Sequence, residues 1–126
     1  APISRMLVIE NTHNKGGGTI WPIAQFTEVA ATGRELGLHV HIDGARLMNA
    51  CVALGVAPTA FTQHVDSVAI CFSKGLGAPV GSALAGTRRE GAQTRQQFAD
   101  VAQVGCGTAA LCGFGGCSLR ALISGT

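Results

Sequence analysis

The amino-acid sequence predicts an α/β fold with a mostly parallel sheet and flanking helices. Short apolar runs of strand length alternate with longer segments of helical periodicity, in the order strand, helix, strand, helix, strand. This order is typical of an open α/β sheet. Polar residues follow each of the first three apolar runs, and ligands of such sheets bind beyond the carboxyl ends of the strands. The sequence therefore predicts both a fold and an edge for a functional site.

The first half of the chain divides into two strands and two helices. The run from Met6 to Ile9 ends at Glu10 and predicts a buried strand, and the glycine-rich residues 11–19 predict a loop. A helix is expected to begin at Pro22 and to stop at Gly37, because proline favours the first helical position and glycine the end. Residues 39–42 predict the second strand, and residues 45–54 predict a helix that ends before Gly55.

The second half contains two more strand candidates and then loses its pattern. Residues 68–72 are apolar on both faces of the predicted strand, as in a parallel strand covered by helices. Residues 82–85 predict a shorter fourth strand. Residues 88–104 have some helical character that Gly91 weakens, and residues 106–126 fit neither the helical nor the strand period. We expect a core at residues 1–86 and a divergent tail at residues 87–126.

Composition narrows the partners and the compartment. A net charge of +2 does not indicate a nucleic-acid or membrane partner, and no apolar stretch reaches the about 20 residues of a membrane helix. Five cysteines without regular spacing are a poor disulfide framework, so we expect free thiols and a cytoplasmic location. The chain opens on Ala-Pro-Ile-Ser without a methionine, so we expect it to be part of a longer protein.

Lys74 is a candidate nucleophile. It follows the third predicted strand and precedes a glycine-rich turn. If the strand end desolvates the amine, the pKa of a lysine falls and the free amine can form a Schiff base. The alternative is a lysine whose charged end simply reaches solvent.

Asp43 and Arg46 follow the second predicted strand within one helical turn of each other. Asp43 is either the N-cap of the next helix or a carboxylate that holds the ring nitrogen of a cofactor. Arg46 could pair with Asp43 or bind a substrate carboxylate. Ser73, next to Lys74, is a candidate donor to a cofactor phosphate.

His13 lies in the loop after the first predicted strand, where it is either solvated or a base near neutral pH. Strand alternation places His39 and His41 on one face, which would suit a pair of metal ligands. No further residue completes a metal motif with them, and we expect no metal site.

Three stretches together resemble the low-specificity L-threonine aldolase family of fold-type-I pyridoxal-phosphate enzymes. They are ENTHN at residues 10–14, HIDGARLMNA at residues 41–50 and FSKGLGAPVGS at residues 72–82. They occur in the order of the family and with similar spacing. The resemblance implies that residues 1–86 are part of the large, pyridoxal-phosphate-binding domain of a transferase-like fold.

The resemblance also implies a reaction, which is the cleavage of L-threonine or L-allo-threonine to glycine and acetaldehyde. Lys74 would carry pyridoxal 5'-phosphate as a Schiff base, Asp43 would hold its ring nitrogen, and Arg46 would contact the substrate carboxylate or the ring oxygen. His13 would lie near the β-hydroxyl of the substrate, a β-hydroxy-α-amino acid. The full-length enzyme would be a homo-oligomer.

Two alternatives stay open at this point. Asp43 and Lys74 are shared by other fold-type-I enzymes, so the chain could belong to a β-eliminating lyase or an aminotransferase. It could also be a catalytically inactive fragment, because the family has an upstream phosphate-binding segment and a C-terminal domain that this chain does not contain. We therefore expect the isolated chain to be a poor catalyst.

Overall fold

The computed structural model describes residues 2–86 and the backbone of residues 109–113. In these residues, five strands form one sheet in the order β1-β2-β3-β4-β5. Their bounds are β1 Met6–Glu10, β2 His39–Asp43, β3 Ser67–Cys71, β4 Ser82–Gly86 and β5 Ala109–Gly113. The bounds of the predicted strands are thereby confirmed to within one residue, but β1 is not the buried strand expected, because Met6 and Val8 are exposed. Strand β5 lies in a region for which the sequence predicted no element.

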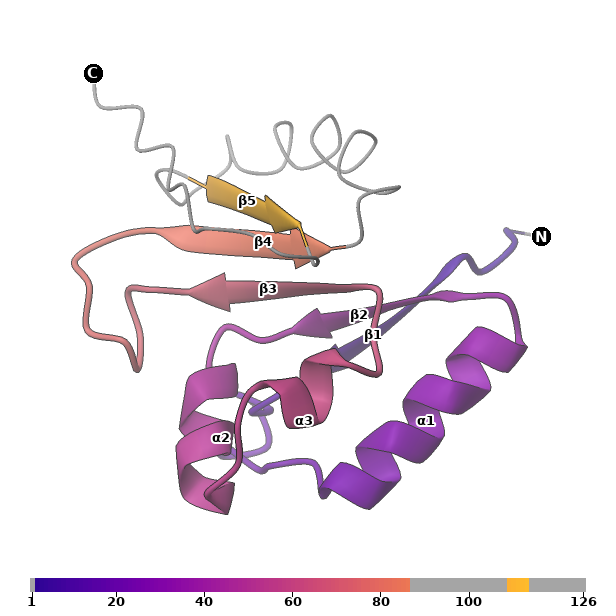
Figure 1. Cartoon of the computed structure of the whole chain (residues 1–126), viewed down its shortest axis with the longest axis horizontal. Helices are drawn as coiled ribbons and strands as arrows, with labels where there is room; N and C mark the ends of the chain where they lie inside the picture. The colour runs from indigo at the N-terminus through magenta and orange to yellow at the C-terminus, as the bar shows by residue number, and fades with distance from the viewer. Residues whose placement is uncertain (1, 87–108, 114–126) are drawn as a thin grey trace.

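The directions of the strands determine which loops can meet. Strands β1, β2 and β3 are parallel, with Glu10 beside Asp43 and Asp43 beside Ala69 in the register. Strand β4 runs antiparallel to β3, and β5 runs parallel to β4. Figure 1 shows the arrowheads of β2 and β3 pointing one way and that of β4 the other. The sheet is therefore mostly parallel, as predicted, with one reversal between β3 and β4.

Three helices cover one side of β1, β2 and β3 (Figure 1). They are α1 Ile23–Glu35, α2 Leu47–Leu54 and the four-residue α3 Thr59–Thr62. Alternation sends Val40 and Ile42 of β2 towards these helices, where both are fully buried. The opposite side chains of β2, His39, His41 and Asp43, therefore lie on the other face of the sheet.

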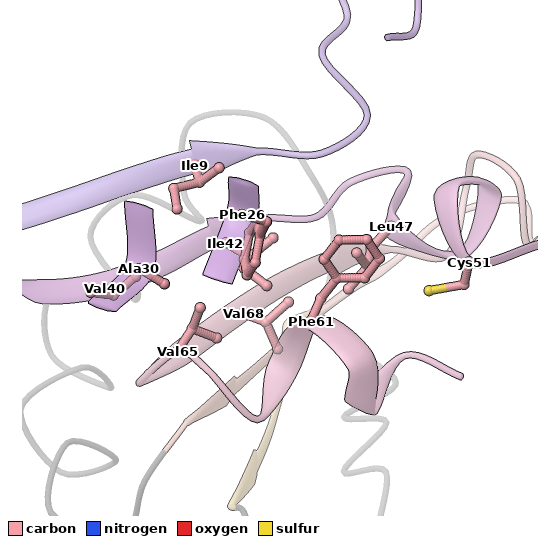
Figure 2. Close-up of a cluster of buried hydrophobic side chains, with 10 residues drawn as sticks. All are labelled: Ile9, Phe26, Ala30, Val40, Ile42, Leu47, Cys51, Phe61, Val65 and Val68. Carbon is pink, nitrogen blue, oxygen red and sulfur yellow. The ribbon is translucent and has the colours of Figure 1, made fainter. Parts of the chain in front are cut away.

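An apolar cluster joins the helices to the sheet (Figure 2). Its centre is the pair Phe26 of α1 and Phe61 of α3, whose ring centroids are 5.1 Å apart in an edge-to-face arrangement. Both rings are fully buried. Such pairs add stability beyond the area that they bury. The cluster fixes α1 and α3 on the sheet and thereby fixes the strands whose ends carry the polar residues.

The helix boundaries differ slightly from the prediction. Pro22 precedes α1 as its N-cap, and α1 begins at Ile23. Helix α2 begins at Leu47 rather than at residue 45, because Asp43–Arg46 form a turn in which the Leu47 N–H donates to the Gly44 carbonyl at 2.9 Å. Helix α3 was not predicted.

Both glycine stops are confirmed. Gly37 and Gly55 have φ angles of 72° and 65°, a conformation that favours glycine. The residue after each donates its N–H back into the helix, from Leu38 to the Gly33 carbonyl and from Val56 to the Cys51 carbonyl. The helix considered for residues 88–104 lies outside the described residues. Within the part of the chain that is described, no helix is long and apolar enough to cross a membrane.

Candidate active site

The loops after β1, β2 and β3 meet at one edge of the sheet. Glu10 and Asp43 end their strands on the same rung of the parallel ladder, and β3 continues two residues beyond that rung to Cys71. The Asn11 N–H donates to the Asp43 carbonyl at 3.0 Å, and the Gly44 N–H donates to the Ala69 carbonyl at 2.8 Å. The structure therefore brings the segments of His13, Asp43 and Lys74 to the same edge, as the sequence predicted.

Asp43 is exposed at this edge and does not cap helix α2. The N-cap position belongs to Arg46, and no side chain caps the helix. The Asp43 carboxylate accepts a long contact of 3.4 Å from the Ala45 N–H. Within residues 2–86, no ion pair joins Asp43 to the half-buried Arg46. The alternative readings of an N-cap and of an internal ion pair are therefore wrong, and both charged groups are available to a ligand.

Lys74 lies in the hairpin loop between β3 and β4, residues 72–81. The Phe72 N–H donates to the Gly81 carbonyl and the Ala78 N–H to the Phe72 carbonyl, at 2.8 and 2.9 Å. These bonds close the base of the loop and leave Ser73 and Lys74 exposed. The expectation that a buried strand end desolvates the Lys74 amine is wrong, because the chain leaves the sheet at Phe72 and carries the lysine outwards.

The lysine loop packs against helix α2. A Cβ atom at Gly75 would overlap the side chain of Asn49, so the glycine allows the loop to lie directly on the helix. Because α2 begins immediately after Arg46, this contact places the Lys74 loop beside the segment that carries Asp43 and Arg46. Asn49 was not predicted as a site residue, since no spacing rule relates residue 49 to residue 75.

His13 is held in a tight loop beside Glu10. Its backbone forms a bridge to Thr19, in which the His13 N–H donates to the Thr19 carbonyl at 2.9 Å. The His13 Nε2 atom lies 3.4 Å from Glu10 Oε2, and Glu10 Oε1 accepts the Asn14 N–H at 3.2 Å. Glu10 is a contact residue that the sequence prediction did not assign.

His39 and His41 both contact the hydroxyl of Ser67. His39 Nε2 and His41 Nδ1 each lie 2.7 Å from Ser67 Oγ. Burial lowers the pKa of His41, the nearby Asp43 opposes that shift, and His39 adds to it. Among residues 2–86, no group of three His, Cys, Asp or Glu side chains is arranged to hold a metal ion.

A further polar group at the edge has an unused donor. Asn11, the first residue after β1, is fully buried, and its Oδ1 atom lies 3.5 Å from the Trp21 N–H. Its Nδ2 atom has no hydrogen-bond partner in the described structure. A buried donor without an acceptor costs free energy unless a ligand or water satisfies it. A polar residue directly after a buried strand was the signal that could have singled out Asn11.

Parts of known proteins are similar to this chain in sequence and fold. The profile of the family described as beta-eliminating lyase matches residues 1–116. The low specificity L-threonine aldolase of Escherichia coli K12 is 47% identical over 85 residues, which cover 68% of this chain and 25% of that protein. Low-specificity L-threonine aldolase 1 of Arabidopsis thaliana is 44% identical over 87 residues, covering 69% of this chain and 24% of that protein.

A solved structure supports the same relationship. A crystal structure assigned as an L-allo-threonine aldolase from Listeria monocytogenes superposes with a TM-score of 0.54 at 26% identity. The match covers 57% of this chain and 20% of that one. The chain thus spans about a quarter of the length of the curated relatives that it matches.

Proposed function

The chain belongs to the beta-eliminating lyase family, and from that premise we propose that it is part of a pyridoxal-phosphate-dependent aldehyde-lyase that cleaves L-threonine or L-allo-threonine to glycine and acetaldehyde. The family is generally dependent on this cofactor. The observation that carries the proposal is the shared edge of β1, β2 and β3, at which the loops of His13, Asp43 and Lys74 meet. The identity to threonine aldolases favours this reaction over the others in the family.

The residues at the edge fit such a cofactor. When bound, pyridoxal phosphate supplies a protonated ring that accepts electrons from the substrate. The exposed Asp43 carboxylate would hold the ring nitrogen in its protonated form, and the exposed Lys74 amine would attach the cofactor covalently. Ser73 would donate to the phosphate. The unsatisfied Nδ2 donor of Asn11 is a further group at this edge that a polar ligand could use.

Two side chains would handle the substrate. Arg46 would bind the carboxylate of the amino acid with its planar guanidinium, or contact the ring oxygen of the cofactor. His13 would accept the proton of the β-hydroxyl, because that oxygen becomes the aldehyde oxygen when the Cα–Cβ bond breaks. A histidine suits this step since its ring gains and loses a proton near neutral pH.

A β-elimination is the second candidate reaction, favoured by the description of the family itself. It would use the same Asp43 and Lys74 but would release a β-substituent rather than an aldehyde. Analysis of the products distinguishes the two reactions. Glycine and acetaldehyde from threonine support the aldolase, and ammonia with a keto acid supports elimination.

The surroundings of the enzyme are part of the proposal. Cys51 and Cys71 are free thiols in the described structure, which supports a reducing compartment, and we propose the cytoplasm. The small-molecule partner would be a β-hydroxy-α-amino acid. The full-length protein would act as a homo-oligomer.

Lys74 provides the test of the proposed function, with Lys15 as a matched control because it is the other lysine of the sequence and is also exposed. In the full-length protein, Lys74→Ala should abolish acetaldehyde release from threonine, whereas Lys15→Ala should retain it. Borohydride reduction of the cofactor-loaded protein should leave the cofactor as a permanent covalent label, and mass spectrometry should find this label on the Lys74 peptide. Label on Lys15, or turnover that survives Lys74→Ala, would contradict the proposal.

A further inference from the structure

Glu10 contacts the His13 loop at two points. Its Oε2 atom lies 3.4 Å from the ring nitrogen Nε2 of His13, and its Oε1 atom accepts the N–H of Asn14 at 3.2 Å. Glu10 is the last residue of β1 and pairs with Asp43 of β2, so the sheet fixes the position of its backbone. One side chain therefore connects the rigid strand end to both the ring and the backbone of the loop.

Gly16 lies beside the Nδ1 atom of the His13 ring. A Cβ atom at Gly16 would lie 2.5 Å from His13 Nδ1 and 2.8 Å from Thr19 Oγ1. The absence of a side chain at residue 16 therefore leaves room for the ring. The backbone bridge between His13 and Thr19, with the Gly18 N–H donating to the His13 carbonyl at 2.9 Å, closes the loop around it. Nε2 therefore faces the Glu10 carboxylate, and residue 16 puts no side chain in the space beside Nδ1.

We infer that Glu10 is a positioning residue of the lyase, which keeps a proton on Nε2 of His13 and so makes Nδ1 the atom that accepts the β-hydroxyl proton of the substrate. The inference rests on the proposed function. A carboxylate favours the proton on the nitrogen that faces it, and the other nitrogen of a neutral imidazole then carries the lone pair. Without this carboxylate the ring is free to populate both tautomers.

The proton transfer balances at named atoms. The O–H bond of the substrate breaks, a bond from Nδ1 to that proton forms, and the oxygen pair becomes the carbonyl bond of the aldehyde. The electron pair of the Cα–Cβ bond stays with the glycine fragment. His13 then carries protons on both nitrogens and a positive charge beside the negative Glu10, which is a more favourable arrangement than an unpaired cation.

Glu10→Gln in the full-length holoenzyme tests the inference, because glutamine keeps the shape and an acceptor for the Asn14 N–H but removes the charge. We expect kcat for threonine to fall about 10-fold to 100-fold, with KM within about twofold, since the lost contact acts in the proton-transfer step. Exchange of the α-hydrogen of glycine with deuterated solvent uses no β-hydroxyl and should be unchanged. Glu28→Gln, an exposed glutamate of α1, is the matched control and should leave both rates unchanged.

Two measurements separate positioning from a structural defect. In a His13→Asn background, Glu10→Gln should cause no further loss, because Glu10 acts only through His13. Nitrogen-15 NMR of the neutral His13 ring should show the Nε2-protonated tautomer in the parent protein. In Glu10→Gln it should show a mixture of the Nε2- and Nδ1-protonated tautomers. Equal tautomer populations in the two proteins, additive losses in the double variant, or an equal fall in glycine exchange would overturn the inference.

The same experiments distinguish failure of the inference from failure of the proposed function. A parent holoenzyme that does not cleave threonine refutes the proposed function and, with it, the catalytic part of the inference. A parent that cleaves threonine while Glu10→Gln retains full kcat refutes the inference and leaves the proposed function standing. The NMR result tests the Glu10–His13 contact without any need for turnover.

Discussion

At the scale of single residues, β2 presents a row of titratable side chains on the face away from the helices. His39, His41 and Asp43 alternate along the strand, and Ser67 of β3 lies 2.7 Å from a ring nitrogen of each histidine. A hydroxyl has one proton and two lone pairs, so Ser67 can donate to at most one of the two rings. At most one of the two histidines can therefore present an unprotonated ring nitrogen to Ser67, which couples their tautomers through one oxygen.

His41 makes the stability of the fold depend on pH. Burial lowers its pKa below 6.5, with Asp43 opposing and His39 reinforcing the shift. As the pH falls through 6.5, the unfolded chain therefore takes up a proton at this residue before the folded chain does. The contribution of His41 to the free energy of unfolding is present above pH 6.5 and decreases as the pH falls below it.

Urea denaturation checks this expectation. Between about pH 7.5 and about pH 5.5, the free energy of unfolding should fall less steeply in His41→Asn than in the parent protein, because the variant lacks the titrating ring. Comparing the two slopes removes the contribution of the carboxylates, which the proteins share. Parallel slopes would show that His41 is not protonated differently in the folded and unfolded states.

The residues of the site show what a sequence can and cannot reveal. Asp43, Lys74 and His13 could be assigned to one edge because each follows an apolar run, and parallel strands end together. The exposure of Lys74 could not be predicted from the sequence, because it depends on where the chain leaves the sheet. Glu10 stands three residues before His13, but outside a helix this spacing does not predict the contact that the loop makes between their side chains.

At the scale of secondary-structure elements, long periodic segments were predictable and short ones were not. Helix α1 has enough turns for an apolar period to emerge, and its end is marked by Gly37. Helix α3 consists of Thr-Ala-Phe-Thr, which is too short to show any period. Its place in the fold comes from tertiary packing, since Phe61 is fully buried against Phe26.

The Phe26–Phe61 pair should therefore contribute strongly to the attachment of both helices. Phe26→Ala leaves a cavity at a fully buried position and should lower the free energy of unfolding by about 3–5 kcal/mol. Val52→Ala in α2 is the control, because Val52 is 83% exposed and its truncation should change stability by less than about 0.5 kcal/mol. Denaturant unfolding of both variants measures the difference. Losses of similar size would place Phe26 outside the core.

At the scale of the whole molecule, the direction of β4 was not predicted from the sequence. A strand at residues 82–85 was expected, but the direction of β4 opposite to β3 was not. The direction of a strand depends on how the chain returns to the sheet, and neither apolar periodicity nor composition encodes it. The short connection at residues 72–81 was the available signal, since parallel neighbours need a longer crossover.

The antiparallel β3–β4 pair also predicts the order in which the strands pair during folding. The β3–β4 pair closes through residues 72–81, whereas the β1–β2 pair must first close the long segment between Glu10 and His39. Shorter loops lose less entropy on closing, so the hairpin that carries Lys74 should form early. In pulsed hydrogen exchange during refolding, amides of β3 and β4 should gain protection no later than those of β1. In this order, the hairpin that carries Lys74 forms before β1, which carries Glu10, joins the sheet. Earlier protection of β1 would contradict it.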